Sequence, residues 1–111
     1  MESYIFEIPI NRLFFDNAMW KWILENCPEM GKKINPTGLP KNIAQPLGQL
    51  QDWKLVNIQK AYNSNISIKS IDIQKHYNSN GIESGYFIIL DGRHRVVKAV
   101  YNKKTTVDAI L

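Results

Sequence analysis

The chain has 111 residues, of which 44% are hydrophobic and 22% charged, and it carries a formal net charge of +4. This length fits one compact domain without room for a second ordinary core, and the composition is far from that of a disordered chain. No apolar stretch approaches the ~20 residues of a membrane helix, and the N-terminus lacks the layout of a secretion signal. We therefore expect a soluble, cytoplasmic protein with one domain over residues 1–111 and no membrane partner.

Residues 4–10, "YIFEIPI", predict the first strand because apolar residues alternate with Glu7 and Pro9. The acid and the proline suit a sheet edge or one solvated face. The apolar side of this strand consists of Tyr4, Phe6, Ile8 and Ile10.

A helix is predicted from Asp16, its candidate N-cap, to Pro28, which should stop it. Its apolar stripe, which should face the core, consists of Trp20, Ile23, Leu24 and Cys27. Cys27 is the only cysteine, so neither an internal disulfide nor a cysteine-based zinc site is available. We interpret it as a small buried hydrophobic residue rather than a reactive thiol.

The middle of the chain is less regular. Residues 31–49 hold three Pro and three Gly and predict a loop, with a short helix opening at Pro46. A helix is predicted behind Asp52, although residues 53–58 also fit the start of a strand. Residues 65–74 indicate one or two strand pieces, and residues 77–85 a turn or hairpin loop.

The last third gives the clearest pattern. Residues 86–90, "YFIIL", predict a strand that is buried on both faces near the centre of a sheet. A helix follows directly, and residues 105–111 predict a closing strand. In that helix one side should pack on the sheet (Val96, Val97, Val100 and Tyr101) and the other should face outward (Arg95, Lys98 and Asn102).

The turn between this strand and this helix, "DGRHR" at residues 91–95, is the candidate site. The start of a helix presents free backbone N–H groups and the positive end of the helix dipole. Gly92 allows a ligand to approach the backbone closely. Arg93 and Arg95 offer bidentate donors to phosphate, and His94 adds a titratable donor.

The charge pattern agrees with an anionic partner. Between Asp91 and Lys104 five basic residues stand against one acid, so this segment alone carries +4. A structural alternative stays open: Asp91 caps the helix, His94 packs or caps, and the arginines pair with Glu83 or Asp108. Lys98, Lys103 and Lys104 are more simply a solvated face than a nucleic-acid groove.

Residues 85–111 resemble the C-terminal part of the ParB/sulfiredoxin-like domain. That pattern consists of an apolar strand, a D-G-x-H-R or G-x-R-R turn, a helix of small and apolar residues, and a closing strand. "FEIPINRL", residues 6–13, is similar to the first strand of the family. The helix after Asp16 and the stretch Gln45-Pro46-Leu47 lie roughly where the family has its first helix and a G-L-x-x-P segment.

The resemblance implies a small α+β domain with a mixed sheet and a C-terminal strand–turn–helix–strand unit. It implies that a nucleotide or nucleic-acid phosphate binds at the turn, through Gly92, Arg93, His94 and Arg95. The catalytic candidates are His94, Asp91 and Arg95. Sulfiredoxin has its essential cysteine where this chain has Arg93, so the resemblance does not extend to sulfinic-acid reduction. From the resemblance we expect no counterpart of the helix-turn-helix domain of a partitioning ParB.

Three functions remain open. The first is a metal-dependent nucleotide hydrolase, phosphotransferase or nuclease that uses Mg²⁺ and ATP or CTP. In it His94 is the general acid, and Glu7 or Asp16 is the base or a Mg²⁺ ligand. The second is a non-catalytic DNA- or protein-binding regulator of plasmid or phage type. The third is a toxin domain of a larger polymorphic protein.

Overall fold

A five-stranded mixed sheet carries four α-helices in the computed structural model, which describes residues 4–34 and 49–111. The fold class is therefore α+β, as predicted. The strands are β1 (Ile5–Pro9), β2 (Leu13–Phe14), β3 (Ile71–Tyr77), β4 (Glu83–Asp91) and β5 (Thr106–Ile110). The helices are α1 (Asn17–Asn26), α2 (Pro28–Lys33), α3 (Asp52–Asn63) and α4 (Arg93–Tyr101), and a 3₁₀ turn, η1 (Ile10–Arg12), joins β1 to β2.

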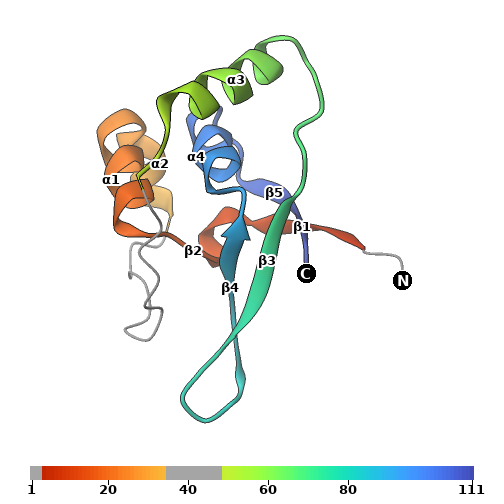
Figure 1. The fold of residues 1–111 in the computed structure, drawn as a ribbon. Coiled ribbons are helices and arrows are strands. Elements are labelled where there is room, and N and C mark those ends of the chain that lie inside the picture. The colour runs from red at the N-terminus through yellow and green to blue at the C-terminus, as the bar shows by residue number, and fades with distance from the viewer. Residues whose placement is uncertain (1–3, 35–48) are drawn as a thin grey trace.

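The strand order is β1-β5-β3-β4-β2, so the central strand is β3. β1 pairs antiparallel with β5, and β3 pairs antiparallel with β4, whereas β3 with β5 and β2 with β4 are parallel. Figure 1 shows the helices gathered on the side where β4 ends, with the β3–β4 hairpin pointing away from them. The ends of three strands, Asp91 of β4, Ile71 of β3 and Thr106 of β5, therefore lie along one border of the sheet next to α4.

β4 lies next to the central strand β3, in agreement with the expected place near the centre of the sheet, but the prediction that residues 86–90 are buried on both faces was wrong. β4 has the two-residue β2 as its outer neighbour, and only Ile89 is buried, while Leu90 is 58% exposed. Along β3 and β4 the buried residues are Ile71, Ile73 and Ile89, so an apolar run does not by itself predict burial on both faces. The strand is also longer than predicted, and the turn before it is confined to residues 78–82.

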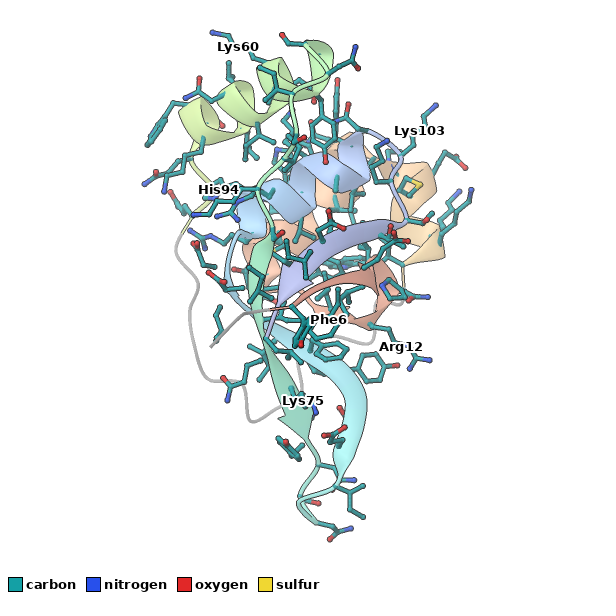
Figure 2. The ribbon with its side chains drawn as sticks, turned by 90° about the vertical axis from the view of Figure 1, so that its right-hand side faces the viewer. Phe6, Arg12, Lys60, Lys75, His94 and Lys103 are labelled. Atoms are coloured by element: carbon teal, nitrogen blue, oxygen red, sulfur yellow. The ribbon has the colours of Figure 1, made fainter. Side chains whose placement is uncertain are left out.

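β1 is an edge strand, as Glu7 and Pro9 indicated. Its apolar side is only partly covered: Ile8 and Ile10 are buried, whereas Tyr4 is 73% exposed and Phe6 39%. Figure 2 shows Phe6 on the part of β1 that lies away from the helices. The alternation therefore predicted the strand correctly, but not how far along it the core extends.

The first predicted helix is present but divided. Asp16 caps α1 as predicted, and its carboxylate accepts a hydrogen bond from the backbone N–H of Met19 at 2.7 Å. Pro28 begins α2, since the first turn of a helix tolerates proline. Ile23 and Cys27 are buried as expected, but Leu24 is 46% exposed and Met19 takes a place in the core.

The assignment of residues 52–63 to a helix is confirmed over the strand alternative, with Gln51 rather than Asp52 at the N-cap. Residues 66–70 precede β3 without forming a strand. Residues 35–48, where the short helix at Pro46 and the Gln45-Pro46-Leu47 stretch were expected, lie outside the described residues. Among the described helices, none has the length and apolar character needed to cross a membrane.

α4 is the most buried of the described helices, and the prediction was wrong for one residue on each of its two faces. Val96, Val97 and Val100 are buried as expected, but Tyr101 is 47% exposed and Lys98 is buried. The Lys98 ammonium lies 4.2 Å from the centre of the Tyr101 ring and 5.6 Å from that of Trp22, so aromatic faces replace water around the charge.

This burial follows from the packing of α1 and α3 against the two flanks of α4, which leaves little of the helix in water. Burial lowers the pKa of Lys98, and the neighbouring Cys27 acts in the opposite direction. Burial also raises the pKa of the Cys27 thiol, in agreement with a packed rather than a reactive cysteine.

Candidate site at the turn between β4 and α4

Gly92 holds the turn in a conformation that suits glycine. Its φ is +107°, and a Cβ built on it would lie 2.6 Å from Cγ2 of Ile71, a fully buried residue of β3. Gly92 is itself the N-cap of α4, without a side-chain cap, so the structural alternative in which Asp91 caps this helix was wrong. The register of β4 against β3 also shifts by one residue at Leu90, directly before the turn. Such bulges often re-aim the side chains beside a site.

Arg95 is held on the inner side of the turn. Its guanidinium donates one hydrogen bond to the carbonyl of Ser70 and another, 3.1 Å long, to the Asp91 carboxylate. Its side chain is only 17% exposed, and Tyr62 of α3 and residues 67–69 lie near it. The alternative in which the arginines pair with Glu83 or Asp108 was wrong, because Arg95 pairs with Asp91, Arg93 pairs with Asp16, and Glu83 pairs with Lys75.

Arg93 joins the turn to the N-terminus of α1. One guanidinium nitrogen lies 3.5 Å from the Asp16 carboxylate and another donates to the carbonyl of Gln49 at 3.1 Å. Asp16 is only 4% exposed, so it acts both as the cap of α1 and as a buried counter-ion. Of the two acids proposed as partners of the turn, the structure brings Asp16 to it.

Glu7 is not brought to the turn. It lies on β1, and β5 and β3 separate that edge strand from β4. The prediction that Glu7 could serve as the base or a metal ligand at this turn was therefore wrong.

His94 is buried between α3 and α4, with 8% of its surface exposed. Figure 2 shows it close to the start of α4. Its Nε2 accepts a hydrogen bond of 2.9 Å from the backbone N–H of Gln51, so this nitrogen carries no proton and the ring is the neutral Nδ1–H tautomer. The interaction ties the N-cap of α3 to the first turn of α4.

The pKa of His94 is lowered below its usual 6.5. Burial is the largest cause, followed by the positive charges of Arg93, Lys54 and Arg95. Protonation of the ring would place another positive charge near these three cations. A proton on Nε2 would also break the hydrogen bond from the backbone N–H of Gln51.

We expect His94 to make the protein less stable in acid. As the pH falls below about 6.5, the unfolded chain binds the proton first, so the free energy of unfolding decreases until the pH has passed the folded pKa. In His94→Gln the side-chain oxygen can still accept from Gln51 but does not titrate, so this part of the decrease should disappear. Urea unfolding between about pH 7 and pH 5 measures it. In Lys54→Gln the decrease should be smaller than in the unaltered protein, because one of the positive charges that lower the pKa of His94 is gone. If His94→Gln and the unaltered protein lose stability equally between these pH values, His94 is not the cause.

A hollow of about 450 Å³ opens beside the turn, and residues of α3 that the sequence did not indicate form its other wall. Trp53, Lys54 and Asn57 stand on that wall, and Trp53 is 63% exposed. The Lys54 ammonium lies 5.5 Å from the centre of the Trp53 ring. Only the packing of α3 against α4 brings these residues to residues 91–95; a tryptophan next to a lysine in a first helical turn carries no such signal in the sequence.

The carboxylates near the turn differ in what they could hold. Asp91 is exposed and lines the hollow, whereas Asp16 is buried against Arg93 and Met19. Within residues 4–34 and 49–111 no three histidine, cysteine or acidic side chains come together as a metal site. Mg²⁺ commonly takes one carboxylate together with the phosphates of its substrate, and Asp91 fits that role.

The chain matches no protein-family model, no curated protein and no solved structure. Its function is therefore inferred from the residues around this hollow.

Proposed function

We propose that this chain binds a phosphate group of a nucleotide or nucleic acid in the hollow beside residues 91–95. The observation that carries the proposal is the meeting of three cations, Lys54, Arg93 and Arg95, with one carboxylate, Asp91, in the wall of one hollow. With His94 neutral, these residues leave a net charge of +2. The positive end of the α4 dipole points to the same place and favours an anion there.

A phosphate would exchange with the carboxylates that the arginines now contact. Arg95 shares its guanidinium between Ser70 and the exposed Asp91, so a phosphate oxygen can replace Asp91 without unpairing a buried acid. Lys54 is exposed on α3 and can reach the same anion from the opposite wall. Charge-assisted hydrogen bonds of this kind are roughly twice as strong as neutral ones.

The rest of the hollow fits a flat organic group. Trp53, Ile58, Ile89 and Leu90 supply an apolar wall, and both Trp53 and Leu90 are more than half exposed. An exposed indole ring beside a cation is suited to stacking on a nucleobase. ATP and CTP, which combine phosphates with a base, are therefore the first ligands to test.

Membership of the ParB/sulfiredoxin-like domains belongs to the same proposal. It is supported by the order β4, Gly92, α4 and β5, which follows the order of the elements in the family pattern. The left-handed Gly92 and the cations after it stand where that pattern has its phosphate-contacting turn.

Metal-dependent hydrolysis of a nucleotide or phosphodiester is the second candidate, and the exposed carboxylate of Asp91 favours it. With a phosphate bound in the hollow, Asp91 would hold Mg²⁺, which neutralises charge on the transferred group. Arg95 would orient the phosphate once it is released from Asp91. His94 could donate a proton from Nε2 only after the bond from Gln51 is broken, so its first role is to position the turn.

Calorimetric titration with ATP and CTP, with and without Mg²⁺, tests the proposal. Arg93→Gln and Lys54→Gln should each weaken binding about tenfold, the effect of losing one charge-assisted contact. Lys60→Gln, in the last turn of α3, removes one charge away from the hollow and should leave binding unchanged. Equal affinity of all four proteins would refute the site. Release of phosphate that requires Mg²⁺ and is lost in Asp91→Asn would support hydrolysis over binding alone.

A further inference from the structure

A second hollow, of about 250 Å³, lies beside the first on the same border of the sheet. Two exposed lysines stand in its wall, Lys69 from the residues before β3 and Lys104 from the turn before β5. Its hydroxyl groups come from Tyr62, Ser67 and Thr106. This lining of ammonium and hydroxyl groups is suited to an anion.

The hollow exists because two parallel strands separate at their N-terminal ends. β3 and β5 pair only at Ile71 with Ala109 and at Asp72 with Ile110, so residues 66–70 diverge from the start of β5. Arg95 reaches into this opening and donates to the carbonyl of Ser70. The separation leaves a cleft between main-chain segments where a continuous ladder would have closed it.

The two hollows adjoin through Arg95, which lines both of them. Together they contain five cations, and the two acids are Asp91 and Asp108, which leaves a net charge of +3 with His94 neutral. The cations come from α3, α4, the residues before β3 and the turn before β5: Lys54, Arg93, Arg95, Lys69 and Lys104. These cations extend further than a single phosphate could contact. They therefore indicate an anion that carries several charges along its length.

We propose that the two hollows together form one groove for a single strand of nucleic acid. One phosphate lies at residues 91–95, which rests on the proposed function, and the following phosphates lie at Lys69 and Lys104. The exposed Trp53 ring at the end of the groove stacks on an unpaired base, which a duplex does not offer. Lys104, read from the sequence as solvated surface, is then a phosphate contact.

Binding of a labelled thymidine oligonucleotide of about ten nucleotides, followed by fluorescence anisotropy at several salt concentrations, tests the groove. In Lys69→Gln/Lys104→Gln the affinity should fall about tenfold, and the slope of log affinity against log salt should become shallower by about 1.4, since each phosphate contact on a single strand contributes about 0.7. The affinity for ATP, measured in parallel, should not change.

The matched control is Lys32→Gln/Lys60→Gln, which removes the same charge from α2 and α3 outside both hollows. It should bind the oligonucleotide more tightly than Lys69→Gln/Lys104→Gln, and both double variants should melt at the temperature of the unaltered protein. Equal affinities of the two double variants would overturn the groove, and so would tighter binding of the duplex of the same sequence. If the unaltered protein does not bind ATP but the oligonucleotide affinities differ between the variants as expected, the mononucleotide site is wrong and the groove stands.

Discussion

Replacing Gly92 with alanine should lower the free energy of unfolding by about 2–6 kcal/mol. A left-handed conformation costs a residue with a side chain about 1–3 kcal/mol, and inserting a methyl group into a packed core costs about as much again. Both apply here, because φ is +107° and the new Cβ would meet Ile71 at 2.6 Å to Cγ2 and 3.2 Å to Cα. The main chain of the central strand cannot move aside as the end of a long side chain could.

Gly81→Ala is the matched control for this experiment. Gly81 also has a positive φ, +75°, but a Cβ there meets nothing within 4 Å, so only the conformational part of the cost applies. In thermal unfolding, Gly92→Ala should melt more than about 10 °C below the unaltered protein. Gly81→Ala should melt well above Gly92→Ala and closer to the unaltered protein. If the two variants melt together, the close approach of Gly92 to β3 is not what holds the turn.

Replacing Asp16 with alanine should cost about 2–4 kcal/mol. Loss of an N-cap costs about 1 kcal/mol, and loss of a charge-assisted hydrogen bond about 1.5–3 kcal/mol. Asp16 provides both, to the N–H of Met19 and to Arg93, and it is almost fully buried. Urea unfolding measures the loss. Asp52→Ala, in the first turn of α3 without a side-chain cap, should cost only a few tenths of a kcal/mol.

Asp16→Asn separates the two roles of this residue. Asparagine still caps α1, so the loss of stability should be smaller than in the alanine variant. Because the carboxylate no longer competes for Arg93, phosphate should bind more tightly while the protein becomes less stable. A variant that loses stability and also loses affinity would show that Asp16 orients Arg93 for the ligand instead of competing with it.

The local patterns predicted much of the order of the elements, for reasons that can be named. Asp16 caps a helix, Glu7 and Pro9 mark an edge strand, and Gly92 marks a tight turn. Each of these follows from hydrogen bonding or steric limits within a few residues. The succession of β4, α4 and β5 was predicted from the same local patterns, whereas the α+β class was an expectation from the resemblance.

Solvent exposure was predicted less well. Lys98 looked like a surface residue because it stands opposite the valine face of α4, yet α1 and α3 cover that side as well. Leu24 and Leu90 looked buried and are exposed. Helical or strand periodicity tells which residues share a face, but not how many neighbours will cover it.

The sequence by itself determined the turn at residues 91–95, the cations in it and Gly92, which the conformation of the turn requires. Only the tertiary structure decided what stands across from it: Asp16, 77 residues away from Arg93, and Trp53 and Lys54 on α3. It also decided that Arg95 joins two hollows where β3 and β5 separate. Local chemistry is set by neighbours along the chain, whereas a site is set by contacts between distant segments, and these depend on how the helices pack on the sheet.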